Sequence, residues 1–466
     1  MAKKENAKNL SKELMMEKRK GAGSFTQSDI KKSYEFSEDY KLFLDNSRTE
    51  RDAVNYTIKL AKKNGFTKYS ESKKYKPGDR AYIVNRNKAI GLVVFGKEGT
   101  KQGVNLSIAH IDSPRIDLKP NPLYEDNNLA LFKTHYYGGI KKYQWTTVPL
   151  ALHGVVVKKN GEVIDICIGE KDDEPKFLIT DLLPHLDREQ ATKTMAKAFT
   201  GEDLNILVGS MPFDNSEESD LVKLNVMKLL NEKYGIVEED FLSSELSFVP
   251  CYKTCDIGFD RGLIGGYGHD DKCCAYPAVK AIFDTKIPKK TCITYLTDKE
   301  ETGSDGNTGM QSDFLRYFIY DLAKSDKVEG YKVLSMSKCL SADVNAAFDP
   351  TFPSVYEAKN ASFINEGVVI SKYTGHGGKY DTSDASAEYM GEIRSMLEKK
   401  KIKWQIGELG KVDIGGGGTI AKYVANMNVD VVDLGVPVLC MHAPFEVISK
   451  LDLYMAYKAF FALFAL

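Results

Sequence analysis

From about residue 270 onward, segments with helical spacing alternate with short apolar segments that are typical of buried strands. The stretch KCCAYPAVKAIFD precedes TCITYLTD, and GMQSDFLRYFIYDLAK precedes KVLSMSKCLSADV, so each helical stretch leads into a strand-like one. Such alternation is typical of α/β domains that are built on a mainly parallel sheet. We therefore expect the chain to contain an α/β domain of this kind.

The middle of the chain departs from this pattern. Between about residues 120 and 251 the sequence is rich in β-like runs, with two amphipathic helical stretches between residues 187 and 233. We interpret this part as a β-rich domain that is inserted into the α/β domain. The predicted boundaries are 1–117 for the first part of the α/β domain, 118–256 for the insert and 257–466 for the second part. Within the first part we expect helices over residues 10–19 and 50–64, and a hairpin over residues 80–96.

Composition excludes several classes of partner. The 64 Lys and Arg residues are balanced by 65 Asp and Glu residues, a net charge of -1, so no field of one sign would attract nucleic acid or an anionic membrane. No apolar run approaches the ~18 residues of a membrane span, and the N-terminus lacks the apolar segment of a signal peptide. Eight cysteines without paired spacing favour reduced thiols over disulfides. We therefore expect a cytoplasmic protein.

Ionisable residues gather where the predicted strands end. Because parallel sheets place their sites at the carboxyl ends of strands, these residues are expected to meet. Two imidazoles and several carboxylates are the donors that zinc takes, and a carboxylate can bridge two ions. The residues concerned are His110, Asp112, Asp270, Asp271, Glu300, Glu301, Asp343, His442 and Glu446.

Two local spacings support a metal site. In an extended segment the side chains of His110 and Asp112 share one face, so Asp112 can accept one imidazole N–H and direct the other nitrogen toward a metal ion. The adjacent Glu300 and Glu301 point in different directions, so one can bind metal while the other acts as a base. Each feature also has a structural interpretation, since an aspartate can cap a turn and a histidine can be a core residue. Their conjunction in this order favours the metal site.

The sequence resembles the aspartyl aminopeptidase and vacuolar aminopeptidase I family of dinuclear zinc metallopeptidases. The resemblance runs from about residue 105 to the end of the chain. It implies a metallopeptidase catalytic domain that is interrupted by a β-rich dimerisation domain. It also implies assembly into a hollow oligomer, a tetrahedral dodecamer. The matching stretches are AHIDSPRIDLKP, HYYGGIKKYQWTT, HDDK, DKEETGSDG, LSADVNAAFDP, GGGGTI and DLGVPVLCMHAPFE.

The resemblance also implies roles for individual residues. Asp270 would bridge two divalent ions, with Asp271 as the alternative bridge. His110 and Asp343 would complete the site of one ion, and Glu301 and His442 the site of the other. Glu300 would be the general base, and Asp112 would orient His110. Zn²⁺ is the expected metal, with Co²⁺ and Mn²⁺ as alternatives.

Four further residues are candidates with weaker support. Lys372 lies where aspartyl-preferring relatives have a substrate-contacting lysine, although a solvated lysine fits equally well. Gly416 and Gly417 would let the backbone approach a substrate, or would simply form a tight turn. In relatives, a histidine at the place of His185 reaches into the active site of the neighbouring subunit; the alternative is an exposed loop residue.

The predicted function is a metal-dependent aminopeptidase that releases N-terminal residues from peptides with a water activated by two ions. Two rival functions stay open. One is another dinuclear hydrolase, such as a deacylase or an aminopeptidase of a different cocatalytic family. The other is a non-enzymatic assembly protein on a degenerate peptidase fold. The chain departs from the family pattern at Ala346 and Ala443, where relatives have histidine and serine, and neither position is a predicted metal ligand.

Overall fold

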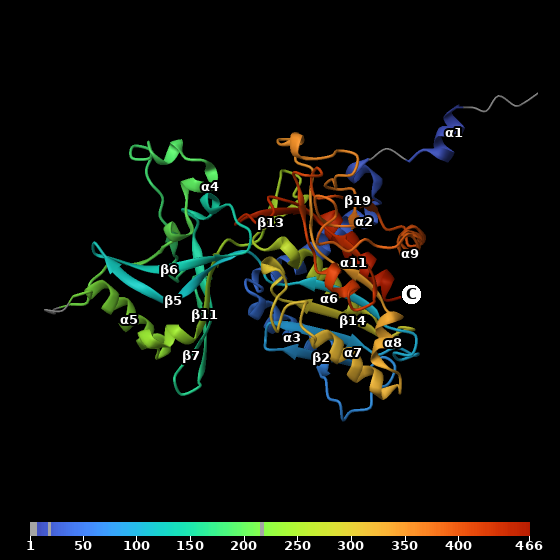
Figure 1. The fold of residues 1–466 in the computed structure, drawn as a ribbon, viewed down its shortest axis with the longest axis horizontal. Helices are drawn as coiled ribbons and strands as arrows, with labels where there is room; N and C mark the ends of the chain where they lie inside the picture. The colour runs from blue at the N-terminus through green and yellow to red at the C-terminus, as the bar shows by residue number, and fades with distance from the viewer. Residues whose placement is uncertain (1–6, 17–19, 215–218) are drawn as a thin grey trace, which may run out of the picture.

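The computed structural model describes residues 7–16, 20–214 and 219–466. Figure 1 shows two parts, a large sheet covered by helices on the right and a smaller β-rich part on the left. The larger part is formed by segments from both ends of the chain, and the smaller part is formed by the segment between them.

The larger part is built on a nine-stranded sheet. Its four central strands, β14, β4, β15 and β21, run parallel to one another, and antiparallel pairs flank them on both sides. In spatial order the strands are β1 (Thr67–Lys68), β2 (Arg80–Asn85), β3 (Ala89–Val94), β14 (Cys292–Thr297), β4 (Asn105–His110), β15 (Lys338–Ser341), β21 (Asp430–Gly435), β17 (Val368–Ser371) and β19 (Trp404–Ile406).

Helices cover both faces of this sheet. Strands β3, β4 and β14 are buried along their whole length, so successive apolar side chains, such as Leu92 and Val93, enter two different cores. One core contains side chains of α2 (Gln27–Asp45), α3 (Glu50–Lys63), α6 (His269–Asp284), α9 (Ala387–Lys399) and α11 (Lys450–Leu463). The other contains side chains of α7 (Phe314–Ser325), α8 (Gly330–Ser335) and α10 (Ala421–Ala425). The predicted α/β class is confirmed. Among the described residues, no helix has both the length and the apolar character needed to cross a bilayer.

The smaller part is a seven-stranded sheet with its own core. Helix α5 (Leu221–Tyr234) packs Val222 and Val226 against apolar side chains of the sheet, such as Phe132. The strands lie within residues 115–250, inside or next to the insert that the sequence predicts. In spatial order they are β8 (Val163–Ile168), β7 (Leu150–Val157), β11 (Ser244–Pro250), β5 (Arg115–Asp126), β6 (Leu129–Tyr137), β10 (Ile206–Gly209) and β9 (Leu178–Ile179).

A third sheet joins segments that are far apart in the sequence. Its central strand, β23, pairs with β13 on one side and β22 on the other. The strands in order are β12 (Cys255–Ile257), β13 (Leu263–Gly266), β23 (Glu446–Ser449), β22 (Pro437–Leu439) and β16 (Asn345–Ala346). A short antiparallel ladder joins β18 (Gly375–His376) and β20 (Gly416–Gly417).

Some local predictions were wrong. The KVLS of KVLSMSKCLSADV belongs to α8 and not to a strand, because Val333 and Leu334 pack together against the core from a helix. Of the two helical stretches expected between residues 187 and 233, α5 forms, but the first is reduced to the four-residue α4 (Met195–Ala198), which has no buried residue. A short helix that buries no side chain gains little stability from tertiary packing. The N-terminal helix α1 (Ala7–Leu14) forms but ends before Met15 and Met16, which the predicted span 10–19 included, and residues 17–19 lie outside the described residues.

Where the two parts meet, a buried histidine joins them. Nδ1 of His153, on β7, lies 3.0 Å from Oδ2 of Asp52 on α3, and its Nε2 lies 3.1 Å from Oε1 of Glu170. Arg48 donates from Nε to the same Glu170 oxygen at 3.1 Å. Burial alone would lower the pKa of His153, but its hydrogen bonds to Asp52 and Glu170 raise it well above the usual 6.5. Burial raises the pKa of Glu170 and hydrogen bonding to His153 lowers it. The lowering is larger, and the resulting pKa is about 2.

We expect His153→Gln to destabilise the junction most at mildly acidic pH. The stabilisation by a histidine with a raised pKa is fully present below the pKa of the unfolded state, about 6.5, and declines as the pH rises toward the folded value. The stabilisation by carboxylates with lowered pKa values is fully present above their unfolded values, at most about 4.5, so the effect is largest between about pH 4.5 and 6.5. Removing one partner of a buried ion pair lowers the free energy of unfolding by about 3–5 kcal/mol. Melting temperatures of both proteins from pH 5 to 9 check this; a difference that grows with pH would contradict it.

Candidate metal centre

Three of the predicted site segments follow central strands of the large sheet. His110 is the last residue of β4, Glu300 and Glu301 lie in a short turn after β14, and Asp343 comes two residues after β15. Because β14, β4 and β15 are parallel neighbours, their carboxyl ends lie at one edge of the sheet. These side chains therefore meet there.

The other two predicted ligands come from the third sheet. Asp270 lies in the first turn of α6, which follows β13, and His442 lies in the loop between β22 and β23. Since β13 and β22 both pair with β23, the loop that carries His442 is held close to the start of α6. Two sheets thus contribute to one site.

The predicted ligands form two donor sets that share Asp270. Nε2 of His110 lies 3.1 Å from Oδ1 of Asp270 and 3.6 Å from Oδ1 of Asp343. Nε2 of His442 lies 3.3 Å from the other oxygen of Asp270, Oδ2, and 3.4 Å from Oε2 of Glu301. Within each set the ligand atoms lie within 4.8 Å of one another. This arrangement could hold two adjacent cations with one carboxylate between them.

The electrostatics of the site also fit cations. Burial and the charge of Asp270 raise the pKa of Glu301 well above its usual value, and burial also raises the pKa of Asp343. Oε1 of Glu301 is buried without a hydrogen-bond partner among the described residues. Positive ions would offset the repulsion between these carboxylates and satisfy the unpartnered oxygen. Imidazole nitrogen and carboxylate oxygen are donors that zinc accepts.

Asp112 holds several of these groups in place. Its carboxylate accepts hydrogen bonds from the backbone N–H of Glu300 at 3.2 Å and of Glu301 at 3.1 Å. Nδ1 of His110 lies 3.3 Å from Asp112 Oδ1 and 3.1 Å from its backbone carbonyl. An acceptor at Nδ1 leaves Nε2 free to face Asp270 and Asp343.

Glu446 has a positioning role that the sequence analysis did not assign. Its Oε1 accepts the backbone N–H of His442 at 2.8 Å, and its Oε2 accepts the backbone N–H of Asp270 at 3.1 Å. One buried carboxylate therefore fixes the backbone of a residue in each of the two segments that come from the third sheet. Its place four residues after His442 was visible in the sequence, but its link to Asp270 depends on the tertiary fold.

The adjacent glutamates differ in their surroundings. The side chain of Glu301 is 3% exposed, whereas that of Glu300 is 17% exposed and lines a cavity of about 270 Å³. Oε2 of Glu300 lies 4.0 Å from Nε2 of His110. Burial and the charge of Asp343 raise the pKa of Glu300 well above its usual value. Glu300 thus faces the cavity beside the donor sets and is placed to exchange a proton there.

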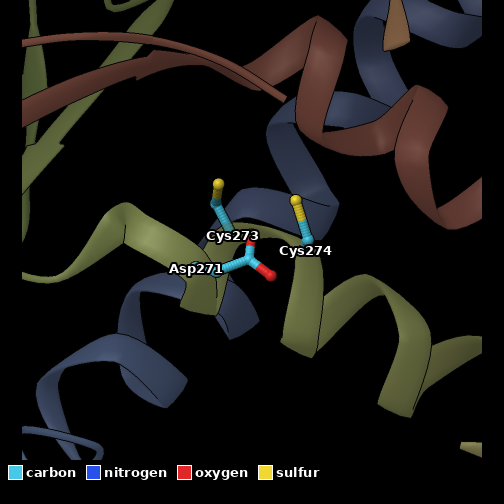
Figure 2. Close-up of side chains that lie close together, drawn as sticks. All are labelled: Asp271, Cys273 and Cys274. Atoms are coloured by element: carbon cyan, nitrogen blue, oxygen red, sulfur yellow. The ribbon is translucent and has the colours of Figure 1, made fainter. Parts of the chain in front are cut away.

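Asp271, the alternative bridge, faces a different group. Figure 2 shows its carboxylate beside the thiols of Cys273 and Cys274 on α6. All three residues are fully buried, and burial raises the pKa of Asp271 well above its usual value and that of Cys273 to about 12. Neutral thiols are poor metal ligands. Asp270 is the carboxylate that lies between His110 and His442.

The four candidates with weaker support lie in different surroundings in the structure. Gly416 and Gly417 line the cavity, and Gly416 has a φ of +127° and lies so close to the backbone of β18 that an added Cβ would be 2.4 Å from the carbonyl oxygen of Gly375. Lys372 is not among the described lining residues, and its Nζ pairs with Asp384. His185 lies in an exposed loop after β9 in the smaller part, beside a separate cavity. Substrate contacts of all four residues stay predictions.

Comparison with known proteins identifies the family. The chain matches the family model "Aminopeptidase I zinc metalloprotease (M18)" over residues 43–464. A "Probable M18 family aminopeptidase 1" of Clostridium acetobutylicum is 47% identical over 450 residues, which are 95% of this chain and 97% of that protein.

Solved structures agree with this match. The crystal structure of an M18-family aminopeptidase from Thermotoga maritima has a TM-score of 0.92 and 42% identity, and the match covers 97% of this chain and 100% of the other. The structure of the S. cerevisiae mApe1 dodecamer has a TM-score of 0.74 at 21% identity, covering 92% and 96%, and at that identity it shows the fold alone. The resemblance seen in the sequence is confirmed, and with it the prediction of a metal-dependent aminopeptidase: the chain belongs to the M18 family of aminopeptidase I zinc metalloproteases.

Proposed function

We propose that this aminopeptidase cleaves the N-terminal residue from peptides with a water that two divalent ions would activate. The observation that carries the proposal is the pair of donor sets that share Asp270, with Glu300 beside them at the cavity. His110 and Asp343 would hold one ion together with Asp270, and Glu301 and His442 would hold the other. The donors suit Zn²⁺ and would also accept Co²⁺ or Mn²⁺. When bound, two such ions polarise the scissile carbonyl and lower the pKa of a water toward 7.

The residues of the chain supply the proton transfers. Glu300 takes a proton from the attacking water at its carboxylate and delivers it to the nitrogen of the leaving amine as the peptide bond breaks. Asp112 keeps Glu300 in position through the backbone N–H of that residue, 3.2 Å away. Bound metal would lower the pKa of Glu300 from its raised value, because cations then offset the charge of Asp343. The base would therefore be ionised at the pH at which it works.

Hydrolysis of aminoacyl nitroanilides tests the function. We expect the metal-free protein to be inactive and the zinc-loaded protein to release nitroaniline only from substrates with a free α-amine. An N-acetylated substrate is the matched control; release of acetate from it, with no nitroaniline from the free-amine substrate, would indicate a deacylase. A panel of Leu, Met, Asp and Glu substrates tests Lys372, since a cationic contact would favour Asp and Glu. No hydrolysis with any metal would contradict the proposal.

We also propose that the segment 118–256 forms a dimer interface and that dimers assemble into a tetrahedral dodecamer. Support comes from the exposed apolar side chains of this segment, which include Leu182, Leu183, Leu186 and Met195. A relative with the same fold is described as a dodecamer. The eight cysteines, all unpaired, support a reducing compartment such as the cytoplasm.

In such an assembly His185 would act in the active site of the partner subunit, donating a hydrogen bond to the carbonyl oxygen as negative charge develops. A preorganised donor of this kind contributes about 2.7–4 kcal/mol, or 10²–10³-fold in rate. Mixing two inactive variants, His185→Ala and Glu300→Gln, should then restore activity, because some mixed dimers combine an intact Glu300 with a neighbour's intact His185. Full activity of His185→Ala alone would exclude a catalytic role. Its inactivity without restoration after verified subunit exchange would place the histidine in its own chain's site.

A further inference from the structure

The metal centre is in contact with the inserted segment at one loop. Strand β6 ends at Tyr137, and the two glycines that follow, Gly138 and Gly139, run past the donor sets. These residues belong to the HYYGG stretch, which matched the family pattern without receiving a role. We infer that this loop is a positioning element of the metal centre: Tyr137 holds Asp112, the carbonyl of Gly139 orients His442, and together they set the affinity for metal. The inference rests on the proposed function, because it takes His442 and Glu301 as ligands.

The first contact fixes Asp112. The hydroxyl of Tyr137 donates to Asp112 Oδ2 at 2.8 Å, the same oxygen that accepts the backbone N–H of Glu301 at 3.1 Å. Asp112 also faces Nδ1 of His110. The Tyr137 hydroxyl therefore acts on a carboxylate that contacts a residue from each donor set. Removing this hydroxyl would leave that carboxylate oxygen with one hydrogen bond fewer in a buried place.

The ring of Tyr137 is itself held in place by a cation–π contact. The guanidinium of Arg115, on β5, lies 4.0 Å from the centre of its ring. Arg115 is fixed in turn by Glu50 at 3.0 Å and by Asp117 at 2.8 Å. Burial and the charge of Asp112 raise the pKa of Tyr137 well above its usual value, so the hydroxyl keeps its proton and remains a donor. With the ring against Arg115, the hydroxyl points at Asp112.

The second contact fixes the tautomer of His442. Its Nδ1 lies 2.7 Å from the carbonyl oxygen of Gly139. Because a carbonyl only accepts, Nδ1 must carry the proton, and in the neutral ring Nε2 then carries the lone pair. That nitrogen is the one that faces Asp270 and Glu301, at 3.3 and 3.4 Å. The backbone of the inserted segment therefore directs the metal-binding nitrogen of a ligand that comes from the α/β part.

The close approach of this loop requires glycine. Gly138 has a φ of +75°, and a Cβ added there would lie 3.2 Å from Oε2 of Glu301 and 3.3 Å from its Cβ. The oxygen concerned is the one that faces His442. A side chain at position 138 would thus push on one donor set while leaving Asp343 and His110 untouched. The loop can be perturbed at its tyrosine or at its glycine, and the two changes should act differently.

The test compares metal affinity in matched variants. Tyr137→Phe keeps the ring and its contact with Arg115 and removes only the hydroxyl; Tyr136→Phe, one residue earlier and partly exposed, is the control. Loss of a residue that orients a metal ligand typically costs 10–100-fold in metal affinity. We expect that loss for zinc in Tyr137→Phe, measured by chelator competition, with an altered visible spectrum of the Co²⁺-loaded protein. Tyr136→Phe should match the wild type in both measurements.

A second pair of variants tests the glycine. Gly138→Ala should weaken the binding of the ion that Glu301 and His442 would hold, so that the bound zinc falls from two ions per chain toward one. Gly65→Ala is the control, because Gly65 has a similar φ of +79° but no atom of the described residues lies within 4 Å of an added Cβ. Melting temperatures of the metal-free proteins show whether each variant folds.

The outcomes separate the inference from the proposed function. If the wild type binds none of Zn²⁺, Co²⁺ and Mn²⁺, the proposed function fails. If the wild type binds two ions but Tyr137→Phe binds them with unchanged affinity and an unchanged Co²⁺ spectrum, the role of the loop is overturned while the proposed function stands. An unfolded Gly138→Ala leaves the decision to Tyr137→Phe, whose ring contacts are intact.

Discussion

Asp270→Asn is expected to remove both metal ions and all measurable aminopeptidase activity. The two oxygens of this carboxylate face different histidines, at 3.1 and 3.3 Å, so each cation site loses a charged ligand in one substitution. An amide offers one carbonyl oxygen and no charge, which cannot serve two cations. Elemental analysis should find about two ions per chain in the wild type and fewer than one in the variant.

Asp271→Asn is the matched control for this substitution. It changes the neighbouring carboxylate, which faces Cys273 and Cys274 instead of the histidines. We expect it to retain both ions. If Asp270→Asn keeps full occupancy and Asp271→Asn loses it, the bridging residue is Asp271 and the two donor sets have been assigned to the wrong carboxylate.

Glu300→Gln is expected to keep both ions and to lose 10²–10⁴-fold in kcat, because the variant cannot accept a proton from the attacking water. Glu301→Gln should instead weaken metal binding, since Glu301 is the buried member of the pair and faces His442. Metal content and kcat of the two variants, measured side by side, separate the base from the ligand. The reverse pattern would mean that the two roles are exchanged.

The sequence predicts the fold well where periodicity reflects burial. The alternation after residue 270 predicts the parallel strands β14, β15 and β21, because strands buried on both faces are short apolar runs. The same signal fails for KVLS, since a short apolar run cannot distinguish a strand from a buried helix. The apolar periodicity also did not indicate α2. The polar side chains of this helix obscure the spacing of the few residues that pack into the core, such as Tyr40 and Phe43.

The residues of the candidate site also fall into a predictable and an unpredictable group. The residues placed at or just beyond strand ends, such as His110 and Asp343, could be predicted because topology brings strand ends together. The residues that orient them could not. Glu446 reaches Asp270 across 176 positions, and Tyr137 reaches Asp112 from another sheet. No local pattern encodes such contacts; they arise when separately formed elements pack together.

Titration of the metal-free protein with zinc tests the central claim most directly. Activity toward a free-amine aminoacyl nitroanilide is measured after each addition, alongside the zinc bound per chain. The two donor sets predict that activity rises until two ions are bound per chain and then remains constant, and that Asp270→Asn shows no rise. Full activity without bound metal, or a plateau at one ion per chain, would contradict a reaction that depends on both sites.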